Sequence, residues 1–144
     1  MVDRKNFATK IDIKFKPDHY FFSQHHNYYH PSIIMRTVVI HNVTLPIGSN
    51  RAENDRLFHQ ALDHDIWFHI DQHPSAHMWM PGVDKSNILD KKKLYTIALQ
   101  LKKYSRYKST NSLTIRYAPK TSLQATSRRS GTLLITGKSQ TINV

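Results

Sequence analysis

The chain has 144 residues, 39% of them hydrophobic and 22% charged, so it is long enough to fold as one domain around its own core. It has no cysteine, which excludes disulfides, cysteine-based zinc sites and thiol catalysis, and no apolar run long enough to cross a membrane. Its 21 lysines and arginines outnumber 10 acidic residues, giving a net charge of +11. This excess favours a polyanionic partner, nucleic acid above all, over charge that serves solubility alone.

The first third of the chain predicts strands around an aromatic loop. Residues 9–15 alternate apolar and polar side chains, as a half-exposed strand does. Residues 17–32 are rich in His and Tyr and contain prolines, so we expect a long loop or hairpin tip there. Residues 33–45 are rich in β-branched side chains and predict one long strand or two short ones, which residues 46–49 would end.

A first helix is predicted immediately afterwards. Asn50 and Glu53 have the spacing of a capping box, and residues 57–62 supply an apolar stripe. Arg51 stands at the start of this helix, where unpaired backbone N–H groups also favour anions. We therefore expect Arg51 to contact phosphate.

A hairpin is predicted next, and its first strand contains the Asp-Ile-Trp-Phe-His motif around Trp67. Alternation along this strand places Trp67, His69 and Asp71 on one face. After a turn, residues 76–80 form the partner strand. The Trp67 indole is either part of the core or an exposed surface on which a base can stack, and the sequence leaves both alternatives open.

The longest predicted helix follows. Asn87 and Asp90 can cap it, and apolar side chains recur at helical spacing between Leu94 and Ser105. Basic side chains fall on the opposite side: Lys92, Lys103 and Arg106. Such a stripe is either a solvated helix face or a phosphate-binding surface, and further cations at Arg128 and Arg129 favour the second reading.

The C-terminal part predicts a strand at residues 113–117 and a hairpin formed by residues 132–136 and 141–144. The complete order is strand, strand, helix, hairpin, helix, strand, hairpin. This order indicates an α+β domain in which two main helices pack on a mostly antiparallel or mixed sheet. We expect one domain over residues 1–144, with N-terminal strands in residues 1–47.

A series of histidines and acids leaves a metal site open as an alternative. If a hairpin brought His69, Asp71, His73 and His77 together, they could hold zinc or manganese and support a metal-dependent hydrolase or nuclease. Otherwise these histidines pack, bond to backbone or touch phosphates. Because the chain has no nucleophile elbow and no phosphate loop of correct spacing, we expect neither an enzyme nor a cofactor.

From about Gly48 onward the chain resembles the NFACT-R domain, the RNA-binding module of the ribosome quality-control elongation factors, which also occurs alone in eukaryotic coiled-coil-domain-containing proteins. The motifs that carry the resemblance are Gly48-Ser49-Asn50, Glu53-Asn54-Asp55-Arg56-Leu57, Asp65-Ile66-Trp67-Phe68-His69 and Ser75-Ala76-His77. Weaker matches are Tyr104-Ser105, Tyr117-Ala118-Pro119 and Gly131.

The resemblance implies a non-catalytic α+β domain that binds structured RNA, namely tRNA or rRNA, with DNA and the ribosome as further candidate partners in the cytoplasm. A protein–protein adaptor on the translation machinery is the third hypothesis. By residue type, we expect phosphate contacts from Arg51, Lys92, Lys103, Arg106, Arg128 and Arg129. We expect a recognition surface formed by Trp67, His69 and His77. The expected structural motif comprises Asn50, Glu53, Asn54, Asp65 and Ser75, in which Asn54 and Asp65 fix geometry by hydrogen bonds to the backbone.

Overall fold

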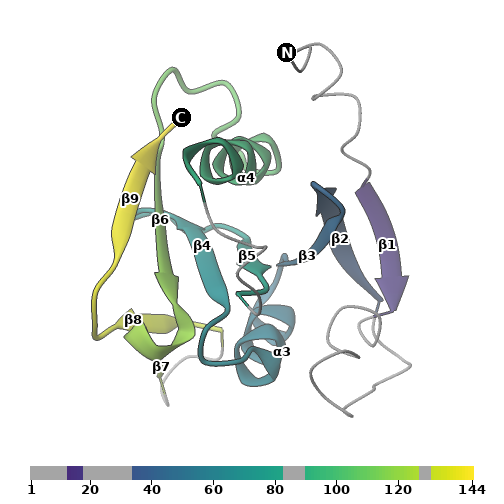
Figure 1. Cartoon of the computed structure of the whole chain (residues 1–144), viewed down its shortest axis with the longest axis vertical. Helices are drawn as coiled ribbons and strands as arrows, with labels where there is room; N and C mark the ends of the chain where they lie inside the picture. The colour runs from purple at the N-terminus through teal and green to yellow at the C-terminus, as the bar shows by residue number, and fades with distance from the viewer. Residues whose placement is uncertain (1–12, 18–33, 83–89, 127–130) are drawn as a thin grey trace.

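The computed structural model describes residues 13–17, 34–82, 90–126 and 131–144, with backbone alone for residues 13–17, 34 and 35. At its centre is a seven-stranded antiparallel sheet of order β1-β2-β3-β5-β4-β6-β9 (Figure 1). Its strands are β1 (Ile13–Pro17), β2 (Ile34–Ile40), β3 (Val43–Gly48), β4 (Ile66–Ile70), β5 (His77–Met80), β6 (Thr114–Pro119) and β9 (Gln140–Asn143). The helices are α3 (Arg51–Gln60), α4 (Lys91–Lys103) and the short 3-10 helix η3 (Lys120–Ser122), and β7 (Leu123–Ala125) and β8 (Leu133–Ile135) form a separate pair. The predicted α+β class is confirmed.

The apolar stretch after residue 33 forms two strands. His41 and Asn42 have positive φ angles of 51° and 64°, as the tight turn between β2 and β3 requires. Pro46 does not end the strand as predicted, because β5 pairs with β3 only at Ile47 and Gly48. Pro46 therefore lies beyond the part of β3 that is paired on both sides, where a missing N–H is tolerated.

Both helices begin at the predicted caps. The Glu53 N–H donates to Asn50 Oδ1 at 2.9 Å, and the Ser49 N–H donates to the Glu53 carboxylate at 2.7 Å. The Lys93 N–H donates to Asp90 Oδ1 at 2.8 Å. Asn87 lies outside the described residues. In the described part of the chain, neither α-helix is long and apolar enough to cross a membrane.

The two faces of the sheet pack against different partners. Alternation along β4 sends Phe68 and Ile70 into a cluster with the buried side of α4, as the helical spacing of residues 94–101 predicts. The opposite face carries Trp67, which packs in a second cluster with Trp79, α3 and the start of β7. All four residues of β5 are buried because both of its faces are covered in this way.

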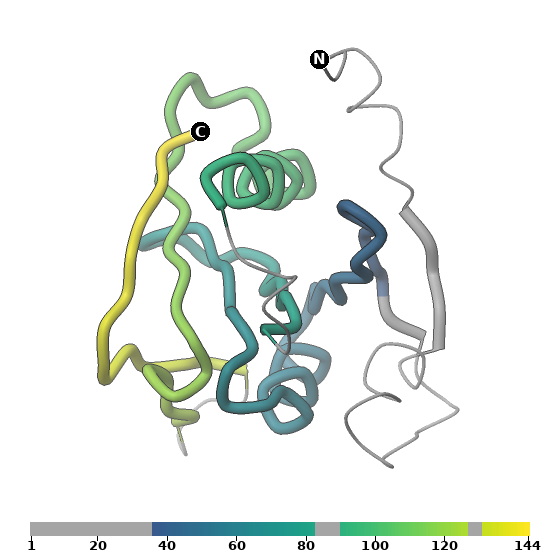
Figure 2. The backbone as a smooth tube through the Cα atoms, viewed as in Figure 1, coloured from purple at the N-terminus to yellow at the C-terminus, as the bar shows by residue number. Residues whose placement is uncertain are grey.

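The predicted C-terminal hairpin is wrong. Strand β8 pairs with β7, a strand that the sequence pattern did not reveal, and β9 pairs with β6 and forms one edge of the large sheet. In Figure 2, the backbone runs from the β2–β3 hairpin to the yellow C-terminal strand at the other side of the sheet. The turn at Gly137 is real, but its two flanking strands join different sheets, because each finds its partner elsewhere in the fold. Local turn chemistry does not decide pairing when a free edge is available.

Candidate nucleic-acid interface

A cleft of about 880 Å³ opens on the α3 side of the sheet. Its walls come from four parts of the chain: the first turn of α3, the β4–β5 hairpin with its loop, the residues after α4, and residues 131–135. It therefore gathers segments that are far apart in sequence. Of the residues predicted to form the recognition surface, all three line this cleft: Trp67, His69 and His77.

A row of polar positions crosses the sheet beneath the cleft. Gly48 on β3 pairs with His77 on β5, and His69 on β4 pairs with Arg116 on β6. The rings of His69 and His77 complete the row, with centroids 4.8 Å apart. Because cross-strand partners share a face of the sheet, the side chains of His77, His69 and Arg116 come together although they belong to three strands, and Gly48 on a fourth strand ends the row.

The Trp67 indole is the buried support of this row rather than an open surface. It is 4% exposed, its ring stacks on His69 at 5.3 Å, and its Nε1–H donates to His77 Nδ1 at 3.1 Å. Of the two alternatives left open by the sequence, exposure of Trp67 is therefore wrong. One indole face and the indole N–H are already engaged, so the two histidines present the floor of the cleft.

Both floor histidines are neutral at physiological pH. Burial lowers the pKa of His69 to about 4, although the charge of Asp71 and a hydrogen bond with the Ile70 backbone act in the opposite direction. Burial lowers the pKa of His77 to about 3, and the nearby His69 adds to this effect. Since His77 Nδ1 accepts the indole N–H, the single ring proton of His77 is on Nε2.

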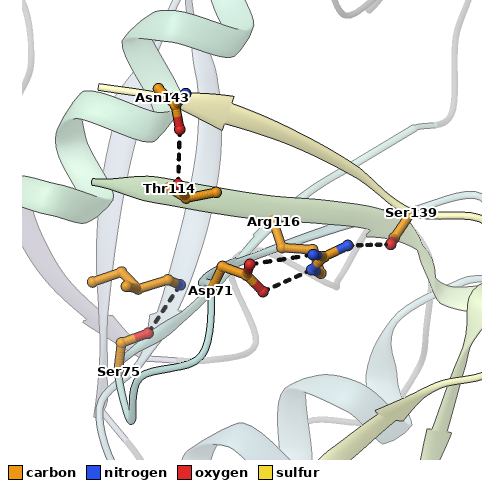
Figure 3. Close-up of polar contacts among 7 residues, drawn as sticks. Asp71, Ser75, Thr114, Arg116, Ser139 and Asn143 are labelled. Carbon is orange, nitrogen blue, oxygen red and sulfur yellow. Dashed lines mark hydrogen bonds and ion pairs between the residues drawn. The ribbon is translucent and has the colours of Figure 1, made fainter. Parts of the chain in front are cut away.

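An ion pair closes one side of the floor. Arg116 Nε and Nη2 donate to the two oxygens of Asp71 at 2.8 and 3.2 Å, and Arg116 Nη1 donates to Ser139 Oγ at 2.7 Å (Figure 3). The hydrogen bonds from Arg116 hold the pKa of Asp71 below its usual range. Arg116, on β6, thus links the residue after β4 to the residue before β9. Because the Asp71 carboxylate compensates the charge of the guanidinium, Arg116 is not an open phosphate ligand.

Three other arginines line the cleft. Arg51 and Arg106 are exposed, as expected for phosphate contacts. The sequence analysis missed Arg36, whose guanidinium lies over the Tyr104 ring at 5.3 Å from its centroid. Alternation in β2 gives the face on which Arg36 lies, but only the fold brings β2 next to the residues after α4.

The predicted basic stripe divides between two surfaces. Lys92 and Lys103 are exposed on the outer side of α4 and do not line the cleft, whereas Arg106 lies beyond the end of the helix and does. Arg128 and Arg129 lie outside the described residues. Helical periodicity placed Lys92, Lys103 and Arg106 in one stripe, but the helix ends before Arg106, so that arginine lies on another surface.

The sequence model of the NFACT protein RNA binding domain, NFACT-R, matches residues 33–141. The chain belongs to the NFACT-R family. The match begins before Gly48 and includes the β2–β3 hairpin. Among solved structures, this NFACT-R domain is similar to the C-terminal part of the fibronectin/fibrinogen-binding protein from Streptococcus suis, with a TM-score of 0.60 and 19% identity. The similarity covers 71% of this chain and 41% of that chain, and it shows a shared fold. A comparison with curated proteins found no match.

Two residues of the expected structural motif fix the NFACT-R backbone as predicted. The Asp65 carboxylate accepts from the Leu62 N–H at 2.8 Å and from the Gly82 N–H at 3.1 Å. Ser75 Oγ accepts from the Ile70 N–H at 3.2 Å (Figure 3). The same hydroxyl donates to the Ala76 carbonyl. These bonds hold both ends of the β4–β5 hairpin and so position the floor histidines.

Asn54 behaves differently from the prediction. Its side chain is 8% exposed and lines the cleft, and its Oδ1 has no hydrogen-bond partner in the described part of the domain. This oxygen therefore accepts no hydrogen bond from the described backbone, unlike the Asp65 carboxylate. Nothing in the motif spacing distinguishes an asparagine that is satisfied within the fold from one that is left open to a ligand.

The residues proposed for a metal site are engaged in other contacts. Arg116 binds Asp71, and Trp67 donates to His77 Nδ1. Within the described ranges, no group of three or more His, Asp or Glu side chains is arranged to hold a metal ion. The geometry of this NFACT-R domain therefore does not support the metal-dependent hydrolase.

Proposed function

We propose that this NFACT-R domain binds structured RNA, tRNA or rRNA, in the cleft and acts without catalysis in translation or ribosome quality control. Membership of a family of RNA-binding domains supports the class of ligand. The observation that carries the proposal is the division of the cleft into an uncharged histidine floor and an arginine rim.

This division matches the two kinds of contact that RNA requires. Phosphates supply affinity and position, and they favour exposed guanidinium groups such as those of Arg51 and Arg106. The N-terminus of α3, at Arg51, adds unpaired backbone N–H groups that also favour anions. The histidine floor belongs to the same cleft and remains for contacts that do not depend on charge.

The test compares two double variants that remove the same charge from different surfaces. Arg51→Ala with Arg106→Ala removes two cations from the cleft, and Lys92→Ala with Lys103→Ala removes two from the outer side of α4. Binding of a tRNA transcript is measured over a salt series. We expect the cleft variant to lose at least about tenfold in affinity, and its salt slope to fall by about 0.7–0.9 for each phosphate contact removed.

The lysine variant is the matched control and should lose much less affinity at every salt concentration. Equal losses in the two variants would show that net charge, and not the cleft, determines binding. No measurable binding of RNA by the parent domain would overturn the proposal as a whole.

A further inference from the structure

The Asn54 side-chain oxygen is an acceptor that the fold leaves unused. It is buried against Gly48 in a residue that lines the cleft, and it has no partner among the residues that the structure describes. Buried polar atoms are nearly always paired in native proteins, so an unpaired one at the wall of a cleft needs an explanation. A ligand that donates a hydrogen bond would provide one.

Gly48 places this oxygen beside the floor histidines. A Cβ on Gly48 would collide with Asn54 Oδ1, so the oxygen occupies the space where the side chain of residue 48 would lie. Gly48 is the cross-strand partner of His77, and partners share a face of the sheet. The Asn54 oxygen therefore lies next to His77 at one end of the polar row.

His77 offers the complementary group. Its Nδ1 accepts from Trp67, which leaves the ring N–H on Nε2 as a donor. His69 packs against it at 4.8 Å between ring centroids and stacks on Trp67. An acceptor, a donor and aromatic surface thus lie side by side, and these are the groups that recognise the edge and face of a nucleobase.

The floor suits a base better than a phosphate. A phosphate needs cationic partners, and the exposed cations of the cleft, Arg51 and Arg106, lie on its walls outside the polar row. The volume of about 880 Å³ is in the range of small-ligand sites, roughly 300–1,000 Å³, which fits one or two nucleotides but no duplex. Sequence-specific contacts to RNA likewise favour unpaired bases, because A-form helices hide base edges in a deep, narrow groove.

We infer that the floor formed by Asn54, His69 and His77 binds an unpaired, unstacked nucleobase of the bound RNA, while the arginine rim holds the adjoining phosphates. This inference rests on the proposed function. It adds that the domain distinguishes single-stranded nucleotides at the end or in a loop of a structured RNA from the paired helix.

The test uses three RNAs with the parent domain. The first is a blunt hairpin, the second is the same hairpin with a short single-stranded extension, and the third carries abasic residues throughout that extension. The third RNA keeps the phosphates and loses the bases. We expect the extension to increase affinity by about fivefold or more, which is the lower range for engaging one base, and the abasic extension to lose most of this gain.

Two variants test whether the gain in affinity from the extension depends on the floor of the cleft. Asn54→Ala removes the unused acceptor from α3 and should abolish most of the gain in affinity that the extension gives over the blunt hairpin. Gln60→Ala is the matched control, because Gln60 Oε1 is another buried oxygen of α3 without a partner in the described structure, and it does not line the cleft. This control should retain the full gain. Since alanine favours helices, both variants are expected to fold.

The outcomes separate the inference from the proposed function. Equal affinity for the normal and abasic extensions would overturn the base site and leave RNA binding intact, whereas no binding of any hairpin would overturn both. A gain that Asn54→Ala retains would also overturn the inference.

Discussion

The two faces of β4 show how one strand serves stability on one side and binding on the other. Phe68 and Ile70 enter an apolar cluster against α4. Trp67 and His69 face the α3 side, where a buried indole supports a half-buried imidazole at the floor of a cleft. Successive side chains of a strand point to opposite faces, so a regular backbone is sufficient for this division.

The faces also differ in how completely they satisfy their polar groups. Among the described residues, three buried polar atoms without a hydrogen-bond partner belong to the α3 side, in Asn54, Gln60 and Trp79, and one belongs to the α4 side, the Tyr104 hydroxyl. Leaving each such group unpaired costs about 1–3 kcal/mol. The unpaired groups are therefore more frequent on the face that carries the cleft.

The largest effect is expected from a cavity on the α4 face. Phe68 is fully buried and stacks on Tyr117 at 5.7 Å, so Phe68→Ala should lower the free energy of unfolding by about 3–5 kcal/mol. The neighbouring His69→Ala on the cleft face should cost only about 1 kcal/mol, because that side chain is half-buried. Urea unfolding of both variants measures the difference, and equal losses would break the comparison between the two faces.

Acid should destabilise the cleft face selectively. The pKa of His69 is lowered to about 4 and that of His77 to about 3, against about 6.5 in the unfolded chain. Between these pKa values the unfolded chain binds more protons than the folded domain does. The contribution of the two histidines to the free energy of unfolding is therefore complete above about pH 6.5 and is lost as the pH falls. Each histidine adds at most about 1.4 kcal/mol per pH unit to this slope.

His69→Gln isolates one of these contributions. Urea unfolding of the parent and the variant between about pH 7 and about pH 5 should give curves that converge as the pH falls, because glutamine does not titrate. Subtracting the free energy of unfolding of the variant from that of the parent at each pH removes the effect of the carboxylates that both proteins share. Parallel curves would contradict the neutral, buried state assigned to His69.

The last comparison concerns the contact between Gly48 and Asn54. Gly48→Ala introduces a Cβ that collides with Asn54 Oδ1, and it should cost about 1–3 kcal/mol in free energy of unfolding. In an Asn54→Ala background the same change should cost clearly less, because the side chain in its way is gone. A double-mutant cycle by urea unfolding measures this coupling. Strict additivity would contradict the placement of the Asn54 oxygen beside His77.

Much of the site could be read from local patterns. The alternation of residues 66–70 put Trp67, His69 and Asp71 on one face, and the N-cap residues located the starts of both helices. Periodicity could not show that α4 ends before Arg106, so it grouped that arginine with lysines that lie on another surface. The same limit produced the wrong C-terminal hairpin, because pairing of β9 with β6 is a contact between distant segments.

The sequence by itself determined the α+β class, the family and the polar face of β4, because strand alternation, helix caps and short motifs are local properties of the chain. Only the tertiary structure decided that Trp67 is buried, that Asp71 binds Arg116 and that Asn54 retains an unused oxygen over Gly48. Each of these facts depends on which strands lie side by side and on which side chains are thereby shielded from water. Burial and cross-strand partners are set by contacts between distant residues, so no local pattern contains them.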